Sequence, residues 1–344
     1  MEMGEKKEVS ANGAPSGKLS AEALERAVFA NTGAARGEVL IGPAVGEDAA
    51  VIEWPQGKLL VFASDPIVGA VSGAGRLLVR VNVNDIASKG AEPCFMTVTI
   101  ILPPSMGEGA VASIMKEIHD ACAADGIAIV GGHTELNDLY AHPVLNAALI
   151  GTADRAFRAS DVASGDVLFV SKHVGIEGMA ILASDRPDLL AGVLSDDETA
   201  LTRGWMDHTS VLGESRLLRG HASFMHDPTE GGFLGGLGEI CRLAGLDADI
   251  SYDAVPLHPF TRRAAEALGF DPLRLVASGS MIAAVPADHA ALVESAFLDA
   301  SIEIARVGVM KAPADGGASC RHPALSAEPG EELWPLLKRG RRPA

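Results

Sequence analysis

A strand, a strongly amphipathic helix and a second strand follow one another in the first half of this chain, and this order limits the possible folds. Residues 95–102 (FMTVTIIL) form a continuous, β-branched apolar run bounded by prolines, which predicts a buried strand. Apolar residues then recur at helical spacing: Val111, Ile114, Met115, Ile118 and Cys122. A further apolar run at 127–130 predicts the second strand. Seven to ten such strands interleaved with helices predict an α/β (α+β) fold.

Polar residues at 152–165 mark the expected boundary between two domains. We therefore expect four parts: a mobile N-terminal tail and helix (1–37), a first domain (38–155), a second domain (156–325) and a C-terminal tail (326–344). A strand at 59–63 is expected to end at Ser64-Asp65-Pro66, and the strand at 127–130 to run into Gly131–Glu135. One helix is expected over 196–213, and no periodic pattern is evident beyond residue 311.

The charge balance excludes some classes of partner. The formal net charge is −17, with 45 acidic and 28 basic residues, so the chain repels a nucleic-acid backbone. Carboxylates can instead collect a divalent cation, which can hold an anionic substrate. The four cysteines include no C-x-x-C pair, which favours neither a zinc site nor a disulfide framework and is typical of a cytoplasmic protein. No apolar run approaches the roughly 18 residues of a membrane span.

Five short segments place acidic or polar residues at the ends of apolar strands or beside glycine. They are GEDAA (46–50), SDP (64–66), VNDIA (83–87), GGHTE (131–135) and MHDPTEGG (225–232). Ligands of open α/β sheets gather where strands end, and carboxylates there can hold a hard cation that bridges phosphate oxygens. Each aspartate alone could equally be a turn residue or a helix N-cap. The inference therefore depends on their joint order.

In this order the segments resemble the PurM-like superfamily, which includes aminoimidazole ribonucleotide synthetase, thiamine-monophosphate kinase, selenophosphate synthetase and the hydrogenase maturation protein HypE. The resemblance extends from about Gly17 to Val309. Its strongest stretches are GEDAAVI (46–52), VNDIASKGAEP (83–93), GGHTE (131–135) and DPTEGG (227–232). The chain looks most similar to HypE-like "AIR synthase-related" proteins, which share such runs and a GIEGMAILA-like segment, here 175–183.

The resemblance implies a two-domain protomer whose N-terminal domain forms a barrel across a homodimer and whose C-terminal α/β domain covers an ATP molecule. It implies Mg²⁺ ligands among four carboxylates: Asp48, Asp65, Asp85 and Glu135. It implies nucleotide contacts from Lys18, Asn84, Gly131, Gly132, Thr134, Asp227, Thr229, Gly231 and Gly232. Asp85 and His133 are the expected catalytic residues. In this scheme the Gly231-Gly232 pair opens a helix whose N-terminus favours an anion.

Two of these residues keep alternative interpretations. Several relatives carry an acidic residue where this chain has His133, and Mg²⁺ prefers oxygen ligands, so His133 is not expected to bind the metal. It is either a hydrogen-bond donor or proton carrier, or a residue that caps a turn. Lys18 lies in GAPSGKLS, which is one residue short of a P-loop, so it either reaches a phosphate or belongs to a solvated tail.

The chain also departs from its relatives. It ends without the reactive cysteine of HypE, its last cysteine being Cys320, and Ser278-Gly279-Ser280 stands where HypE usually has Glu-Gly. These departures disfavour cyanide-ligand synthesis, and the lack of a cysteine before Cys94 disfavours selenophosphate synthesis. We expect an ATP- and Mg²⁺-dependent enzyme that activates or phosphorylates a small substrate. The alternatives are a small-molecule kinase similar to thiamine-monophosphate kinase and a non-catalytic nucleotide-binding regulator or assembly factor, which fold alone does not separate.

Overall fold

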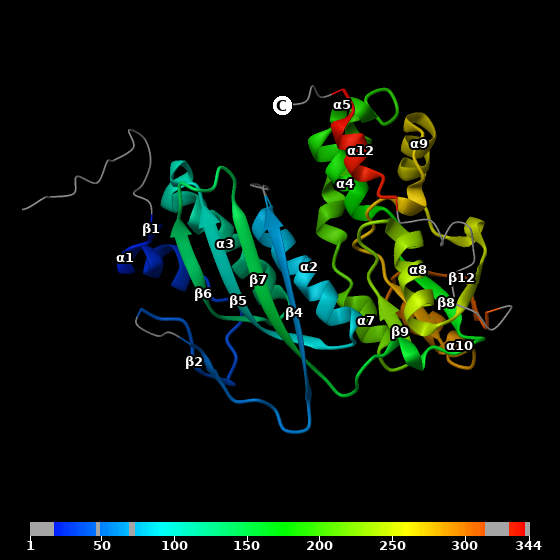
Figure 1. The fold of residues 1–344 in the computed structure, drawn as a ribbon, viewed down its shortest axis with the longest axis horizontal. Helices are drawn as coiled ribbons and strands as arrows, with labels where there is room; N and C mark the ends of the chain where they lie inside the picture. The colour runs from blue at the N-terminus through cyan, green and yellow to red at the C-terminus, as the bar shows by residue number, and fades with distance from the viewer. Residues whose placement is uncertain (1–16, 46–48, 69–72, 314–329, 341–344) are drawn as a thin grey trace, which may run out of the picture. The chain divides into compact units, whose positions relative to one another are not determined.

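The computed structural model describes residues 17–45, 49–68, 73–313 and 330–340 (Figure 1). The expected mobile tail before residue 17 lies outside these ranges. The chain divides into two compact units. Unit 1 comprises Met1–Ile86 and Ala91–Asp154, and unit 2 comprises Ala87–Gly90 and Arg155–Ala344. Within the described ranges, no helix is both long enough and apolar enough to cross a membrane.

Unit 1 is built on a mixed five-stranded sheet in the order β1-β6-β5-β7-β4, in which only β5 and β6 are parallel. Its strands are β1 (Gly17–Lys18), β4 (Leu59–Val68), β5 (Glu92–Leu102), β6 (Ala128–Leu136) and β7 (Val144–Ala153). A separate hairpin pairs β2 (Val39–Ile41) with β3 (Val51–Ile52). Figure 1 shows α2 (Ala74–Ser88) and α3 (Gly107–Ala124) on one face of the sheet.

The core of unit 1 lies between this face and the helices. Helix α3 buries the residues that recur at helical spacing, including Ile114 and Ile118. On β5, Val98 and Ile100 are buried whereas Thr97 is exposed, because successive strand residues point to opposite faces. The predicted succession of strand, helix and strand is thus confirmed.

The described chain has a helix near its start, as expected within residues 1–37, but part of this helix is π-helical. Ser20 caps α1 (Ala21–Leu24) by accepting a hydrogen bond from the Ala23 N–H. The helix then continues as a π-helical turn, η1 (Glu25–Phe29). The helix expected within residues 1–37 is therefore present, and the wider π-helical turn forms its C-terminal half.

Two strands of unit 1 extend further than expected. Strand β4 does not end at Ser64 but continues to Val68, with Asp65 and Pro66 inside it. It lies at the end of the sheet, and among the described strands it pairs with β7 alone. A proline is tolerated on such an edge strand because one side needs no ladder hydrogen bond. Strand β6 continues through Gly131–Glu135 to Leu136, since it pairs with β5 along its whole length. Pairing with neighbouring strands thus overrides the low strand preference of glycine.

Unit 2 contains an antiparallel five-stranded sheet in the order β10-β12-β8-β11-β9. Its strands are β8 (Val167–Ser171), β9 (Phe224–His226), β10 (Asp247–Ile250), β11 (Ile282–Val285) and β12 (Ile304–Lys311). Its α-helices are α4 (Ile176–Asp185), α5 (Pro187–Leu190), α6 (Asp196–Gly204), α7 (Leu212–Leu218), α8 (Gly232–Ala244), α9 (Pro259–Leu268), α10 (Ala290–Asp299) and α12 (Leu333–Lys338). Strands β8 and β11 are buried along their whole length and form the centre of this core.

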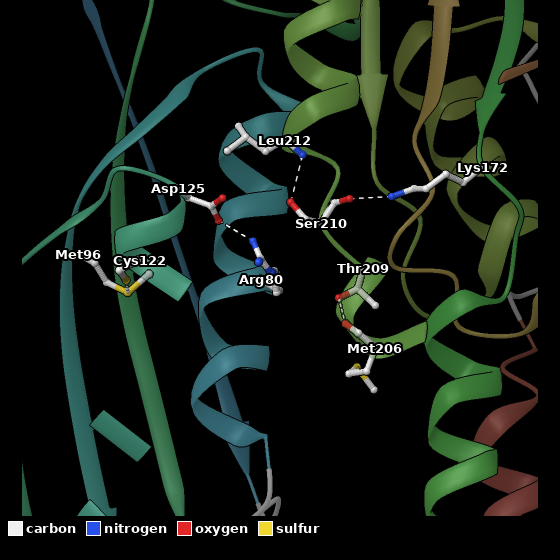
Figure 2. Close-up of polar contacts among 9 residues, drawn as sticks. All are labelled: Arg80, Met96, Cys122, Asp125, Lys172, Met206, Thr209, Ser210 and Leu212. Atoms are coloured by element: carbon white, nitrogen blue, oxygen red, sulfur yellow. Dashed lines mark hydrogen bonds and ion pairs between the residues drawn. The ribbon is translucent and has the colours of Figure 1, made fainter. Parts of the chain in front are cut away.

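The single helix expected over 196–213 is wrong. Helix α6 ends at Gly204, a 3₁₀ turn follows at Trp205–His208, and α7 begins at Leu212. The Lys172 ammonium group stabilises the non-helical connection between α6 and α7 by donating to the carbonyl oxygens of His208 (3.0 Å) and Ser210 (2.7 Å). Figure 2 shows Lys172 reaching Ser210, whose hydroxyl in turn accepts from the Leu212 N–H. A contact from Lys172, which follows β8 and is distant in sequence, therefore interrupts a locally helical pattern.

Candidate functional site

The strand β6 brings together two of the predicted site residues of unit 1. His133 Nε2 lies 3.4 Å from Glu135 Oε2, and both side chains are partly exposed on the same side of the strand. Asn137 Nδ2 donates to the other Glu135 oxygen at 3.0 Å. This hydrogen bond, followed by that to His133, holds the pKa of Glu135 below its ordinary value. Glu135 is therefore a carboxylate at neutral pH, positioned to orient the imidazole ring.

Between and beside these residues, β6 approaches its neighbour too closely for a side chain. Gly132 has a φ of +150°, and a Cβ at this position would lie 1.9 Å from the Val98 carbonyl oxygen. Only glycine meets this requirement. Thr134 points to the face opposite His133 and is buried. The GGHTE segment is thus part of a strand that sends polar groups to both faces of the sheet.

A cavity of about 380 Å³ lies against this segment within unit 1. Its walls are polar and apolar in nearly equal parts, and Leu24 and Val28 from the N-terminal helix and Met115 from α3 supply apolar groups. His133 and Thr134 contribute polar groups, and no carboxylate is found among its lining residues in the described chain. The cavity can therefore enclose a small, largely uncharged group next to His133.

A second group of predicted residues lies around α2. The Asp65 N–H donates to Asn82 Oδ1 at 3.0 Å, and Asn82 Nδ2 donates back to the Asp65 carbonyl oxygen at 3.2 Å. Asn82 is fully buried and also donates to Leu78, so α2 fixes β4 at the position of Asp65. Asn84 is buried and Asp85 is half-buried on the same helix. Sequence reasoning missed Asn82, although a second asparagine within the apolar helix pattern is a signal for it.

The two groups are separated in the sheet. The register places Asp65 opposite Ala147, Ala147 opposite Val98, and Val98 opposite Gly132. Three strand spacings therefore separate β4 from β6, or about 14 Å. Among the described residues, no three His, Cys, Asp or Glu side chains gather closely enough to hold a metal ion.

Two further predicted residues can be placed only in part. Asp48 lies outside the described residues. The backbone of Lys18 lies on β1, where it pairs with Glu135. The N-terminal segment therefore joins the sheet directly beside GGHTE.

The remaining predicted residues lie at the start of α8 in unit 2. Gly231 is the N-cap, with a φ of +79°, and Gly232 opens the helix with a φ of +62°. A Cβ at Gly232 would lie 2.6 Å from the carbonyl oxygens of Leu273 and Leu275. The Gly232 N–H donates to the Thr229 carbonyl oxygen at 3.0 Å, and Asp227 is buried just before the turn. The expectation that the glycine pair opens a helix is confirmed.

Sequence reasoning missed two carboxylates of this region. Glu177 on α4 is half-buried, and burial raises the pKa of its carboxyl group above the ordinary value, with Glu230, Glu331 and Asp227 adding to the effect. Glu177 lies in the GIEG segment, which offered a signal. Glu331 Oε2 accepts a hydrogen bond from the Gly231 N–H at 2.7 Å, from 100 residues further along the chain, and no local pattern indicates it.

The first unit carries GGHTE on the second strand of a mixed sheet, and the second unit has a glycine turn that opens α8. Together they define a two-domain α/β protein of the PurM-like class. The sequence profiles of AIR synthase-related proteins match residues 46–153 with their N-terminal domain and residues 163–320 with their C-terminal domain. The chain therefore belongs to the AIR synthase-related family. This confirms the resemblance inferred from the motifs.

Individual relatives agree with this assignment. The carbamoyl dehydratase HypE of Escherichia coli (strain K12) is 28% identical over 264 residues, covering 73% of this chain and 76% of that protein. A crystal structure of the hydrogenase maturation protein HypE in complex with ATP matches with a TM-score of 0.66 and 23% identity, covering 79% of this chain and 82% of that one. Thiamine-monophosphate kinase from Stenotrophomonas maltophilia K279a matches with a TM-score of 0.68 and 21% identity, covering 82% and 93%. The two structures establish the fold.

Proposed function

We propose that this protein is an ATP- and Mg²⁺-dependent enzyme that activates an oxygen atom of a small substrate or transfers a phosphoryl group to it. The observation that carries the proposal is the turn at Gly231 and Gly232. Its backbone has no room for a side chain at Gly232, and it lies at the start of a 13-residue helix, where the helix dipole favours an anion. The family membership supports the proposal, as does the relative whose structure was solved with ATP.

The donor set of unit 1 fits Mg²⁺ in its chemistry. Asp65, Asp85 and Glu135 offer carboxylate oxygens, which are the ligands that Mg²⁺ prefers. Bound there, the ion would neutralise charge on the phosphates of the nucleotide. Because these carboxylates do not gather within the described part of one chain, the proposal includes a homodimer that completes the site.

The edge of the unit 1 sheet supports a homodimer. Strand β4 is ten residues long and pairs with β7 on one side, and within the described residues no strand pairs with its other side. Leu60, Phe62 and Val68 on this strand are 56%, 61% and 66% exposed. An apolar open edge of this length favours association with another strand. The same strand of a second copy is the partner that we propose.

The residues of GGHTE would act on the substrate itself. Thr134 and the backbone of Gly131 and Gly132 would bind and orient the ligand. His133 would donate a hydrogen bond or carry a proton at Nε2, with the Glu135 carboxylate holding the ring in place. The cavity beside His133 would exclude water from the group that reacts.

Calorimetric titration with Mg-ATP tests the proposal. Asp85→Asn keeps the shape of the side chain and removes its charge, so we expect the binding free energy to weaken by about 1.5–3 kcal/mol, the scale of a charge-assisted contact. Asp138→Asn, an exposed position near the end of β6, is the matched control and should bind as the unaltered protein does. Absence of Mg-ATP binding in the unaltered protein would refute the proposal, and unchanged binding in Asp85→Asn would remove Asp85 from the site.

A small-molecule kinase is the second candidate, favoured by the structural match to thiamine-monophosphate kinase. The two are distinguished by their products, since a kinase retains the phosphoryl group on the substrate and a dehydrating or ligating enzyme releases it as phosphate. Tight ATP binding without turnover of any metabolite mixture would instead indicate a nucleotide-binding regulator.

A further inference from the structure

The carboxylate of Glu331 receives hydrogen bonds from three backbone N–H groups of unit 2. Its Oε2 accepts from Gly231 at 2.7 Å, and its Oε1 accepts from Val276 at 3.3 Å and from Leu333 at 2.7 Å. Gly231 and Val276 belong to the body of the unit, whereas Leu333 is on the same short segment as Glu331. The body therefore presents two converging N–H donors to one anionic group, at the start of a helix with no acidic residue in its own first turn.

The segment that supplies Glu331 is docked on unit 2. Leu333 and Leu336 of α12 are completely buried in an apolar cluster with residues of α4 and α9. Arg186, held by Asp188, donates to the carbonyl oxygens of Leu336 and Leu337 at 3.2 and 2.9 Å. A helix of six residues has little stability of its own, so these contacts with unit 2 keep Glu331 in position.

The charges around Glu331 oppose its position. Burial raises the pKa of the Glu177 carboxyl group, and the nearby charges of Glu230, Glu331 and Asp227 raise it further. A fourth carboxylate is stable there because the N–H groups of Gly231 and Val276 compensate for the repulsion. The N–H groups of Gly231 and Val276 therefore stabilise an anionic group at this position.

We propose that the N–H groups of Gly231 and Val276 form a binding site for a phosphate group, and that Glu331 fills this site as a competitor within the chain until a phosphate ligand displaces it. A carboxylate and a phosphate both accept charge-assisted hydrogen bonds from such donors, so either satisfies the site. Residues 330–340 are then an autoinhibitory segment. This inference rests on the proposed function, because the displacing ligand is the nucleotide or a phosphorylated substrate.

Titration of the full-length protein tests the competition. Glu331→Gln keeps the shape of the side chain and removes the charge, so ATP in the presence of Mg²⁺ should bind about tenfold more tightly, which corresponds to about 1.4 kcal/mol. Glu332→Gln removes the same charge one residue along and should bind as the unaltered protein does. A second variant, Arg339→Ala, loosens the segment by removing a hydrogen bond to the Leu268 carbonyl oxygen and should tighten binding about two- to threefold. In the unaltered protein, saturating ATP should speed amide hydrogen exchange over residues 330–340.

The results separate the inference from the proposed function. A parallel titration with inorganic phosphate distinguishes two kinds of site. If the site binds phosphate in general, Glu331→Gln should bind both ATP and inorganic phosphate more tightly. If the site needs the nucleotide, only ATP should bind more tightly. Equal ATP affinity in all variants, with unchanged exchange over residues 330–340, would overturn the competition and leave the proposed function standing. If no variant binds ATP, the proposed function fails. The titration with inorganic phosphate then tests the phosphate site by itself. Phosphate binding to Glu331→Gln, but not to the other variants, supports the site. The absence of phosphate binding in every variant overturns the site.

Discussion

Replacing Gly232 by alanine tests whether the turn that opens α8 depends on glycine. At a φ of +62° a residue with a Cβ costs about 1–2 kcal/mol. The added atom would also lie 2.6 Å from two backbone carbonyl oxygens, those of Leu273 and Leu275, which cannot rotate away as a side chain can. Displacing them is an overpacking cost of about 1–3 kcal/mol.

The unfolded chain offsets part of this cost, because alanine reduces its flexibility by about 0.4–1 kcal/mol. The net expectation for Gly232→Ala is a loss of roughly 1–5 kcal/mol in the free energy of unfolding. Urea unfolding followed by circular dichroism measures it. ATP affinity should fall as well, since the N–H groups at the start of α8 would move.

The matched control is Gly204→Ala. Gly204 has ordinary helical angles, with a φ of −65°, ends α6, and has open space where a Cβ would be added. Alanine there should be neutral or stabilise the protein by about 0.5–1 kcal/mol. A Gly232→Ala protein as stable as the unaltered one would refute the argument from φ and close approach. Equal destabilisation by both changes would show that the loss is not specific to this turn.

Three further predictions concern His133, which we propose as a catalytic residue, the assembly and the half-buried carboxylate Glu177. His133→Asn should bind Mg-ATP normally, while turnover falls sharply; an unchanged rate would exclude a proton-carrying role. Light scattering should report a mass of twice 35.5 kDa for the unaltered protein. Phe62→Asp on the open edge strand β4 should yield a monomer. Leu201→Asp, at a similarly exposed position of unit 2, should leave the dimer intact. The pKa of Glu177 in the folded protein is raised above its ordinary value of 4.5, so the folded state binds this proton more tightly than the unfolded state does. The free energy of unfolding therefore falls as the pH rises from about 4.5 through the raised pKa. Glu177→Gln should therefore raise the free energy of unfolding at pH 7 and have little effect below pH 4; a destabilised variant at pH 7 would contradict the charge argument.

Elements whose signal is local were predictable. The buried face of α3 is set by residues three and four apart, and the run of residues 95–102 is long enough to specify a strand. The Gly231-Gly232 turn was also predictable, because glycine is the residue that accepts a positive φ at low cost. In these cases the physical cause lies within a few residues, so the sequence pattern contains it.

Elements that depend on a distant partner were not predictable. The extent of β4 and β6 follows from pairing with β7 and β5, which supply hydrogen bonds that no local propensity indicates. The break between α6 and α7 depends on Lys172, more than 30 residues earlier. Local preferences are worth a fraction of a kcal/mol per residue, and tertiary hydrogen bonds and burial outweigh them.

For the candidate site, the sequence by itself determined the family and the chemical types of the residues, because the order of GGHTE and DPTEGG along the chain is a property of the sequence alone. The tertiary structure alone decided how these residues are grouped. It joined His133 to Glu135 through the two-residue repeat of a strand, and it separated Asp65 from both by three strand spacings. It also brought Glu331 to the start of α8 across 100 residues, since burial of Leu333 and Leu336 drives α12 onto unit 2 and carries the carboxylate with it.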